Sequence, residues 1–408
     1  MWKQKTAVFL SSQTLSLLGS SLVQYALIWY ITLETKSGFM MTLYIVCGFL
    51  PTFLLSPFAG VWADRYDRKK LIMISDGLIA FVTLILAVVF MSGGKSLWLI
   101  MVAAALRAVG TAIQGPGIGA ILPQFVPGEY LSKVNGISSS IQAAITLVSP
   151  IISGILITIW PMYIVFFIDV ITAALAIAIL LFFLQVPPHE KASQRQSTTY
   201  FTDMLQGFRY IKEHPYLISF FIFLGIRLFL VTPAAFLTPL QVARSFGSDV
   251  WRLTAIEVVF SGGMLLGGGV ISIWGGFKNH MVTMIFSALI MGLCTIALGL
   301  SEIFWVYLIF TGIFGVAMPF FHTPAAVFIQ EHVQENLLGR VFSINTMLFT
   351  SIMPLGMLIF GPVAEIARIE WILVITGLLM LVQVIAILRD KKLIRAGIIR
   401  AIGNSHFE

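Results

Sequence analysis

Charged residues are scarce in this chain, and their scarcity excludes an ordinary soluble domain. Only 11% of the 408 residues are Asp, Glu, Lys or Arg, whereas 58% are hydrophobic. Soluble domains contain about 25% charged residues, because their surfaces face water. The composition therefore indicates an integral membrane protein.

Cysteine and long polar segments are also nearly missing. Cys47 and Cys294 both lie in apolar runs, so the sequence offers neither a disulfide framework nor a cysteine metal site. The longest polar stretch, residues 187–214, is too short for a sizeable soluble domain. A phosphate-binding loop before Lys95 is excluded, because Val89 stands where its first glycine is needed. With no clustered nucleophile and base either, we expect a protein that is not an enzyme and needs no cofactor, metal or nucleotide.

Long apolar runs, in contrast, make up most of the chain. A membrane-spanning helix needs about 20 predominantly apolar residues. The first run is too long for a signal-peptide core and lacks a cleavage site, so we expect it to remain as a span. The twelve predicted spans are residues 7–32, 40–62, 71–91, 97–122, 135–158, 162–186, 216–240, 252–274, 281–300, 304–329, 341–363 and 371–389.

The basic residues are divided unevenly between the two sides of the predicted membrane. If the N-terminus is cytoplasmic, 18 of the 25 Lys and Arg residues lie inside, 5 lie outside and 2 lie within spans. Positive residues are enriched on the cytoplasmic side, so this distribution predicts that both termini are cytoplasmic. The net charge of +7 therefore reflects membrane topology, and we expect no nucleic-acid partner. The absence of an Asn-x-Ser/Thr sequon agrees with a bacterial plasma (inner) membrane.

The predicted spans form two groups of six, separated by the long polar stretch. We predict a first half at residues 1–186, a cytoplasmic linker at 187–215, a second half at 216–389 and a basic cytoplasmic tail at 390–408. Within the linker, apolar residues recur at helical spacing over 201–211. This spacing predicts an amphipathic helix along the membrane surface.

The two halves show traces of a duplication. Residues 125–134 align with residues 332–341 at an offset of 207, and Gly154 meets Gly361 in the same register. We therefore predict two related six-helix units. Transporters built from such repeats bind their substrate near the membrane midplane.

The most distinctive motif lies between the second and third predicted spans. It reads Gly60-Val61-Trp62-Ala63-Asp64-Arg65-Tyr66-Asp67-Arg68-Lys69-Lys70. Burying each of these charges in lipid costs at least about 2.5–3.5 kcal/mol, so the motif must lie at a membrane surface. The order of residues resembles the signature loop of the major facilitator superfamily. That family consists of transporters that move small solutes by alternating access.

Further segments resemble the branch of this superfamily that contains bacterial macrolide efflux proteins. Asp67 stands where the superfamily usually has glycine, and the branch has aspartate there too. The segments around Arg107, Asp169 and Glu257 are also similar to that branch. The resemblance implies an all-α integral membrane fold of twelve transmembrane helices in two pseudo-symmetric six-helix halves. It also implies the export of amphipathic drugs in exchange for protons, without specifying the drug.

One departure from the proton-driven exporters lies in the fifth predicted span. Those exporters often carry a glycine-rich motif there, and Gly136, Pro150 and Gly154 fit its spacing. Ile145 and Ser149, however, replace two of the expected glycines. A helix that is simply kinked by Pro150 and packed through small residues is the alternative.

By the same resemblance, the charged loop is expected to act as a cytoplasmic latch. Opposite charges can pair with helix ends and with the other half in one conformational state and separate in the next. The alternative is that the cations only fix the topology, although topology alone does not require Asp64. We expect Asp76, about one turn into the next span, to be a structural partner of this cluster, with a substrate site as the alternative. The latch residues are Gly60, Asp64, Arg65, Asp67, Arg68, Lys69 and Asp76.

Charges within the spans need a partner, water or a function. Arg107 in the fourth span and Arg227 in the seventh are candidates for proton coupling or for setting the electrostatics of the cavity. The alternative is a fixed structural role, which for Arg107 would be a bond to backbone carbonyls. Glu257 in the eighth span is a candidate proton carrier, and a solvated acid near Arg252 is the alternative. For Asp169 in the sixth span we expect structural pairing, with proton transfer as the alternative.

A substrate cavity for bulky amphiphiles should be mainly apolar with a few polar groups. The same aromatic residues are equally typical of helices that face lipid. We expect the partners to be a small amphipathic substrate, protons and the lipid bilayer, and the chain to act as a monomer. The rivals are a siderophore or metabolite exporter, a lipid flippase and, outside transport, a membrane sensor. The candidate cavity residues are Gln13, Thr14, Gln24, Tyr25, Trp29, Gln114, Gln142, Phe320 and Phe321.

Overall fold

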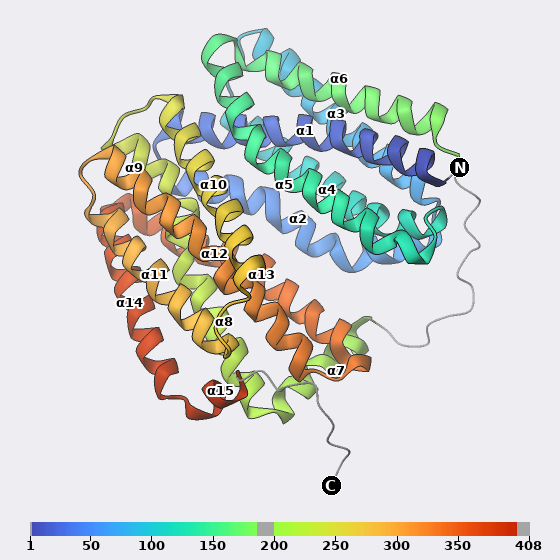
Figure 1. Ribbon diagram of the computed structural model, residues 1–408. Helices are drawn as coiled ribbons and strands as arrows, with labels where there is room; N and C mark the ends of the chain where they lie inside the picture. The colour runs from blue at the N-terminus through green and yellow to red at the C-terminus, as the bar shows by residue number, and fades with distance from the viewer. Residues whose placement is uncertain (1, 186–199, 398–408) are drawn as a thin grey trace. The chain divides into compact units, whose positions relative to one another are not determined.

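The computed structural model describes residues 2–185 and 200–397, and every element in these ranges is a helix (Figure 1). Side chains are described there except at 56–57, 60–61, 63–65, 132, 200–204 and 335–336. Twelve helical segments of the described chain are long and apolar enough to cross a membrane. This confirms the predicted all-α fold with twelve spans.

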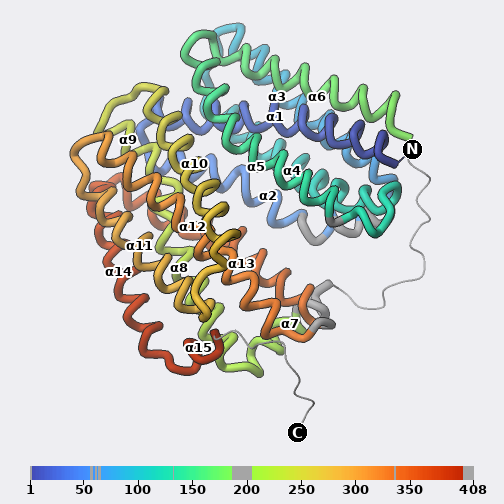
Figure 2. The backbone as a smooth tube through the Cα atoms, viewed as in Figure 1, coloured from blue at the N-terminus to red at the C-terminus, as the bar shows by residue number. Residues whose placement is uncertain are grey.

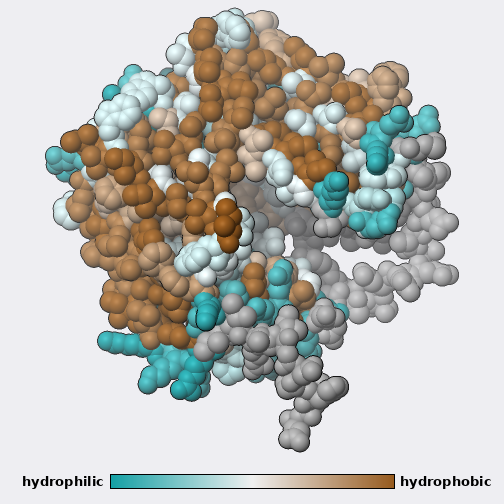
Figure 3. Space-filling model, in the orientation of Figure 1, coloured by the Kyte–Doolittle hydropathy of each residue, from teal (hydrophilic) through white to brown (hydrophobic). Residues whose placement is uncertain are grey.

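The helical architecture follows from the lipid environment. Lipid offers no hydrogen-bond partners, so each span must satisfy its backbone groups internally, and a helix does this. Polar side chains mark helix starts, where the first amides lack partners. Ser37, Asp67 and Asn279 accept hydrogen bonds from the first amides of α2 (Gly38–Arg65), α3 (Arg68–Met91) and α11 (His280–Leu300). Figure 3 shows hydrophobic residues over most of the visible helical surface, as expected for helices that face lipid.

The described chain divides into two compact units. Unit 1 comprises residues 1–197 and 242–258. Within it α1 packs against α5 and α6, α3 packs against α4 and α6, and α2 packs against α4. Figure 2 shows α1, α3 and α6 running beside one another. Besides α2 and α3, its helices are α1 (Trp2–Thr35), α4 (Leu97–Ile121), the short 3-10 helix η1 (Leu122–Gln124), α5 (Gly128–Ile159) and α6 (Met162–Phe183).

Unit 2 comprises residues 198–241 and 259–408. Within it α8 packs against α13 and α14, and α11 packs against α12 and α14. The helices α9 (Thr238–Ser245) and α10 (Val250–Trp274) contribute residues to both units. Besides α11, the other helices are α7 (Tyr200–Glu213), α8 (Pro215–Phe236), α12 (Phe304–His332), α13 (Glu335–Ile366), α14 (Ile369–Arg389) and α15 (Lys391–Ala396).

Three helix pairs repeat with one constant offset. Helices α4 and α12 begin at Leu97 and Phe304, α5 and α13 at Gly128 and Glu335, and α6 and α14 at Met162 and Ile369. Each pair is 207 residues apart, which is the offset found between the loop sequences. The packing also repeats, because α1–α5, α1–α6, α3–α4 and α3–α6 correspond to α8–α13, α8–α14, α11–α12 and α11–α14. Four helix–helix contacts of unit 1 thus recur in unit 2.

Some helix ends differ from the predicted spans. Helix α5 begins at Gly128 and α13 at Glu335, six or seven residues before the predicted starts. The helical backbone continues through polar residues, whereas hydropathy marks only the part that enters the lipid. The predicted span 216–240 is interrupted, because α8 ends at Phe236 after Pro233 and α9 begins at Thr238. In the predicted linker, α7 forms over Tyr200–Glu213, and in the predicted tail α15 forms over Lys391–Ala396.

Candidate functional site

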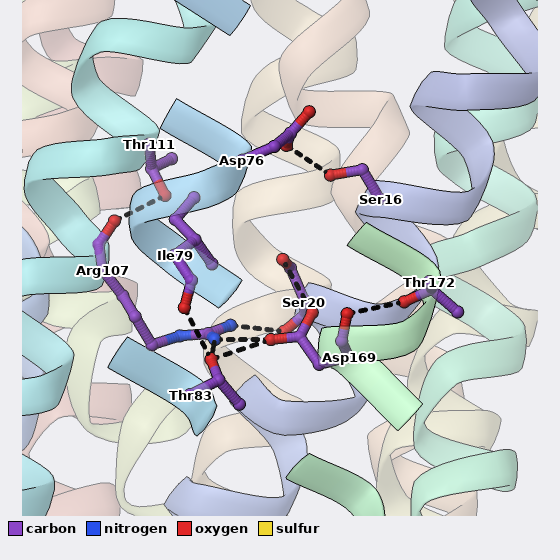
Figure 4. A network of polar contacts seen from close by, with 9 residues as sticks. All are labelled: Ser16, Ser20, Asp76, Ile79, Thr83, Arg107, Thr111, Asp169 and Thr172. Carbon is purple, nitrogen blue, oxygen red and sulfur yellow. Dashed lines mark hydrogen bonds and ion pairs between the residues drawn. The ribbon is translucent and has the colours of Figure 1, made fainter. Parts of the chain in front are cut away.

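A network of polar side chains lies inside unit 1, where α1, α3, α4 and α6 pack together (Figure 4). The network has two layers, one around Arg107 and Asp169 and the other around Asp76. Polar groups that are buried in a protein interior are costly unless they find hydrogen-bond partners. The partners present in each layer therefore indicate which charge state that layer can hold.

Arg107 of α4 and Asp169 of α6 form a buried ion pair. The distance from Arg107 Nη1 to Asp169 Oδ2 is 2.7 Å, and the two side chains are 11% and 0% exposed. Asp169 also accepts hydrogen bonds from Thr83 Oγ1 at 2.9 Å and from Ser20 Oγ at 3.3 Å. Arg107 donates in addition to Thr83 Oγ1 and, at 3.3 Å, to the Ser20 carbonyl. The pair thus joins α1, α3, α4 and α6.

The layer around Asp76 contains no cation among its hydrogen-bond partners in the described chain. Asp76 of α3 is 1% exposed. Its Oδ1 accepts hydrogen bonds from Ser16 Oγ of α1 and from Gln114 Nε2 of α4, both at 2.6 Å. Its Oδ2 is buried without a hydrogen-bond partner among the described residues. The sequence predicts Asp76 as a partner of the charged loop, whereas these hydrogen bonds join α3 to α1 and α4.

Glycines permit the close helix contacts around the network. A Cβ atom on Gly19 of α1 would collide with Thr172 Oγ1 and lie 2.9 Å from Asp169 Oδ1. A Cβ atom on Gly110 of α4 would lie 2.6 Å from Ile79 Cγ1 of α3. Small residues at such positions allow membrane helices to approach closely. The short polar contacts between these helices depend on this approach.

Sequence reasoning assigns no site role to Ser16, Ser20 or Thr83. The signal that could find them is helical spacing. Asp76 and Thr83 are seven residues apart on α3, and Arg107 and Gln114 are seven apart on α4. Residues at this spacing lie on one face of a helix, two turns apart. The two layers therefore repeat along α3 and α4 at the same interval.

Basic residues in the last part of the signature loop bind the ends of neighbouring helices. Arg68 Nη1 donates to the Ala120 carbonyl at 2.7 Å, and Lys69 Nζ donates to the Leu184 carbonyl at 2.7 Å. Carbonyls at a helix C-terminus lack intrahelical partners and carry partial negative charge, so cations stabilise them. Asp67 caps α3 by accepting from the Lys70 amide. All these contacts lie within unit 1, and the latch between the halves stays a prediction.

Three further latch candidates, Gly60, Asp64 and Arg65, lie in the last turns of α2. The side chains of Asp64 and Arg65 are outside the described part of the structure.

Glu257 lies in α10, on the part of this helix that belongs to unit 1. Its side chain is half-buried. Tyr25 of α1 lies close enough to interact with it electrostatically. No hydrogen bond or ion pair joins Glu257 to another residue of the described chain. The carboxyl group is therefore free of the donors that surround Asp169.

Arg227 lies deep in unit 2 and is 1% exposed. Its Nη2 donates to the Ala288 carbonyl of α11 at 2.6 Å, whereas Nε and Nη1 have no hydrogen-bond partner among the described residues. The guanidinium carbon lies 5.9 Å from the centre of the Phe321 ring. The tie to a backbone carbonyl agrees with the structural alternative for this residue. In this structure Arg227 is packed within its unit rather than exposed in a cavity.

The candidate cavity residues differ in exposure. Trp29 and Phe321 are 1% and 2% exposed, so both are packed inside their units and are not presented to a substrate in this structure. Gln24 and Gln142 are exposed, and Gln13, Thr14, Tyr25, Gln114 and Phe320 are half-buried. Gln13 Nε2 is buried without a partner in the described chain, whereas Thr14 donates to the Leu10 carbonyl.

The described part of the chain contains no group of three or more His, Cys, Asp or Glu residues placed to hold a metal ion. Arg107 and Asp169 instead pair with each other, Arg227 binds a backbone carbonyl, and Asp76 accepts hydrogen bonds from neutral side chains inside apolar helices. This arrangement is typical of a membrane protein that holds charged side chains in its interior.

The model of one protein family, the Major Facilitator Superfamily, matches residues 9–357. This match covers most of the chain. The chain belongs to the Major Facilitator Superfamily. It is therefore a multi-pass membrane protein of a transporter family, in agreement with its twelve candidate spans.

The names of similar proteins refer to several kinds of substrate. Macrolide efflux protein A of Streptococcus pyogenes is 27% identical over 382 residues, which cover 93% of this chain and 94% of that protein. The Staphyloferrin A transporter of Staphylococcus aureus is 28% identical over 156 residues, covering 38% and 39%. The Lysophospholipid transporter LplT of Cronobacter sakazakii is 31% identical over 117 residues, covering 29% and 27%.

Solved structures of the superfamily show the same fold. The crystal structure of a single-residue mutant of the nucleoside transporter NupG has a TM-score of 0.72. Its sequence identity is 15%, and the match covers 95% of this chain and 99% of that one. At this identity the likeness concerns the fold alone. The major facilitator fold predicted from the charged loop is thus confirmed.

Proposed function

We propose that the protein is a secondary active exporter of amphipathic, macrolide-like drugs that works by proton antiport and alternating access. The observation that carries this proposal is the similarity to Macrolide efflux protein A over 93% of the chain and 94% of the relative. The match spans both six-helix halves, so it includes the helices that a transport cycle requires. The mainly apolar helices suit a bulky amphiphile.

The proton gradient is the proposed source of energy, because the sequence has no nucleotide-binding motif. One proton that moves inward across 100 mV releases about 2.3 kcal/mol. A free energy of about 1.4 kcal/mol corresponds to a tenfold ratio. One proton per drug molecule would therefore support a concentration gradient of roughly fiftyfold, and any pH difference would add to it.

The charged groups within the spans are the candidates for coupling. Glu257 is half-buried and lacks an ion-pair partner among the described residues, so a proton can exchange at its carboxyl group without breaking a pair. The Arg107–Asp169 pair is proposed to set the electrostatics of unit 1. Arg227 is proposed to do the same in unit 2. The first candidates for substrate contact are half-buried and exposed residues such as Gln24.

The proposed setting is a bacterial plasma membrane with both termini in the cytoplasm and the chain acting as a monomer. In this setting the loop with Asp67, Arg68 and Lys69 lies on the cytoplasmic side. Export then requires the cycle to release the drug on the opposite side.

Two other substrates have support from the relatives. The Staphyloferrin A transporter and the Lysophospholipid transporter LplT each match less than half of this chain. A siderophore or a lysophospholipid is therefore the second candidate substrate. Both are amphipathic or polar molecules that the same scaffold can carry, and a transport assay with these compounds separates them from drugs.

The test is drug extrusion from cells that express the chain, with a macrolide and a cationic dye as substrates. Extrusion of either compound that stops when an uncoupler is added supports proton antiport. Glu257→Gln should abolish uphill extrusion, whereas Glu302→Gln, which changes an exposed acid in the loop before α12, should leave it unchanged. Uncoupler-insensitive extrusion, or extrusion of lysophospholipid but neither drug, would contradict the proposal.

A further inference from the structure

The two buried acids of unit 1 differ in what their partners can do. Asp169 is bound by Arg107, and a guanidinium group can donate hydrogen bonds but cannot accept them. Thr83 and Ser20 supply two more donors to the same carboxyl group. If Asp169 became protonated, the Arg107 charge would remain buried without its counter-charge. The charges of the Arg107–Asp169 layer are therefore balanced in one state, in which Asp169 is ionised.

The partners of Asp76 can satisfy two charge states. Ser16 presents a hydroxyl group, which donates or accepts, and Gln114 presents an amide, which offers either an N–H or a carbonyl oxygen. In this structure both donate to Asp76 Oδ1 at 2.6 Å, as an ionised carboxylate requires. After rotation of the Gln114 amide, its carbonyl oxygen can accept a hydrogen bond from a protonated Asp76. No cation has to move.

Asp76 Oδ2 gives a second reason to expect a change of charge. This oxygen is buried and has no hydrogen-bond partner among the described residues. A buried carboxylate oxygen without a donor is costly, because ionised groups lose their hydration on burial. A proton on the carboxyl group removes that charge. The same position is therefore suited to take up a proton that the transport cycle then releases.

We propose that Asp76 is a proton-binding residue of the transporter. We propose further that the amide of Gln114 changes its orientation with the protonation state of Asp76, and so alters the groups presented at the surface of α4. Gln114 is half-buried, so its amide lies between the buried carboxyl group and the face that we proposed for substrate contact. With Asp76 ionised, the Gln114 N–H groups face inward. With Asp76 protonated, the carbonyl oxygen faces inward and the N–H groups become available to a substrate.

Among the charged groups near Asp76, the carboxyl group of Asp76 itself is the one whose charge changes. Helix α1 has no charged residue between Lys5 and Glu34. Helix α4 contributes Arg107 and helix α6 contributes Asp169, and these two neutralise each other. On α3 itself the nearest charges are the cations at 68–70, two turns away at the helix start. Helix α2 has charged residues only in its last turn, at 64–65.

This inference rests on proton antiport for its role in the cycle, but its chemistry can be tested without a substrate. The full-length protein is reconstituted in liposomes, and infrared spectra are recorded across a pH titration. The wild type minus Asp76→Asn difference should contain a protonated-carboxyl C=O stretch that grows as the pH falls. Asp76→Asn keeps the size of the side chain, and Glu257→Gln serves as a control that leaves this band in place.

A flat difference spectrum would overturn the proposal, because Asp76 would then not change its protonation state. If Asp76→Asn does not fold, Ser16→Ala and Gln114→Leu provide the test. Each removes one hydrogen bond to the Asp76 carboxyl group, so the wild type minus variant difference should show a protonated-carboxyl C=O band whose pH midpoint has moved. An unchanged midpoint in both variants would contradict the assignment.

Drug transport separates this inference from the proposed function. Asp76→Asn should abolish uphill, uncoupler-sensitive extrusion while downhill exchange of the drug continues. If the wild type exports no drug but the Asp76 band titrates, the proposed function fails and the proton site stands. If the wild type exports drug by antiport and the difference spectrum is flat, the reverse holds.

Discussion

At the scale of single residues, the buried Arg107–Asp169 pair allows a prediction of how a substitution changes the free energy of unfolding. Removal of one partner leaves the other charge buried, and breaking a buried pair in this way costs about 3–5 kcal/mol. Asp169→Asn should therefore lower the free energy of unfolding by roughly this amount. Thermal unfolding of the purified protein in detergent measures the loss.

The double variant Arg107→Met/Asp169→Leu is the matched control, because it removes both charges together. Replacement of a buried ion pair by apolar residues of similar size is often neutral or stabilising. We expect this variant to unfold near the wild-type temperature and to lose drug export. A stable double variant that still exports drug would show that the pair only holds the helices together.

The sequence allowed a partial prediction at this scale. Arg107, Asp169, Asp76 and Glu257 could be selected because a charge in an apolar run needs an explanation. Of their partners, Gln114 could be named only as a cavity residue. Ser16, Ser20 and Thr83 could not be selected, because serine and threonine residues occur throughout membrane helices. Which acid faces a cation depends on helix rotation, and rotation is set by packing rather than by hydropathy.

At the scale of helices, the glycines of α10 give a comparison between neighbouring positions. A Cβ atom on Gly267 would collide with the Val316 carbonyl oxygen of α12, whereas a Cβ atom on Gly268 would meet nothing within 4 Å. Gly267→Ala should destabilise the protein by about 1–3 kcal/mol through overpacking. Gly268→Ala should be neutral or slightly stabilising, because alanine favours helix more than glycine does.

Thermal unfolding of the two alanine variants side by side is the measurement. Equal destabilisation by both variants would favour a hinge in this helix over close packing. In the sequence, the run of glycines at 262–263 and 267–269 is compatible with either close helix packing or a hinge. The run alone could not indicate which glycine faces α12, since that depends on the register in which Gly263 and Gly267 meet Gly312 and Val316.

At the scale of the whole molecule, the duplication was visible in the sequence and is repeated by the structure. The loop offset of 207 residues recurs as the offset between three pairs of helix starts. The chemistry is not duplicated, however. Unit 1 buries an ion pair and an acid, whereas unit 2 buries Arg227 against a backbone carbonyl and the Phe321 ring. We infer that the two copies have kept one packing pattern and have diverged in the charges they hold.

The membrane topology is the remaining prediction, and the scarcity of cysteine makes it easy to test. Cys47 and Cys294 can be replaced by alanine to give a cysteine-free chain. Single cysteines are then placed at four exposed positions, two in each unit: Ser92 and Tyr66 in unit 1, Glu302 and Lys278 in unit 2.

The positive-inside distribution places Ser92 and Glu302 outside the cell and Tyr66 and Lys278 in the cytoplasm. A membrane-impermeant maleimide should therefore label Ser92→Cys and Glu302→Cys on intact cells. It should label Tyr66→Cys and Lys278→Cys only after the cells are permeabilised. The opposite pattern would place the charged loop outside, and its cations could then not act as a cytoplasmic latch. Each span changes the side of the membrane on which the next loop lies. If the labelling matches this expectation in one unit and is reversed in the other, the predicted even number of spans before the linker is wrong.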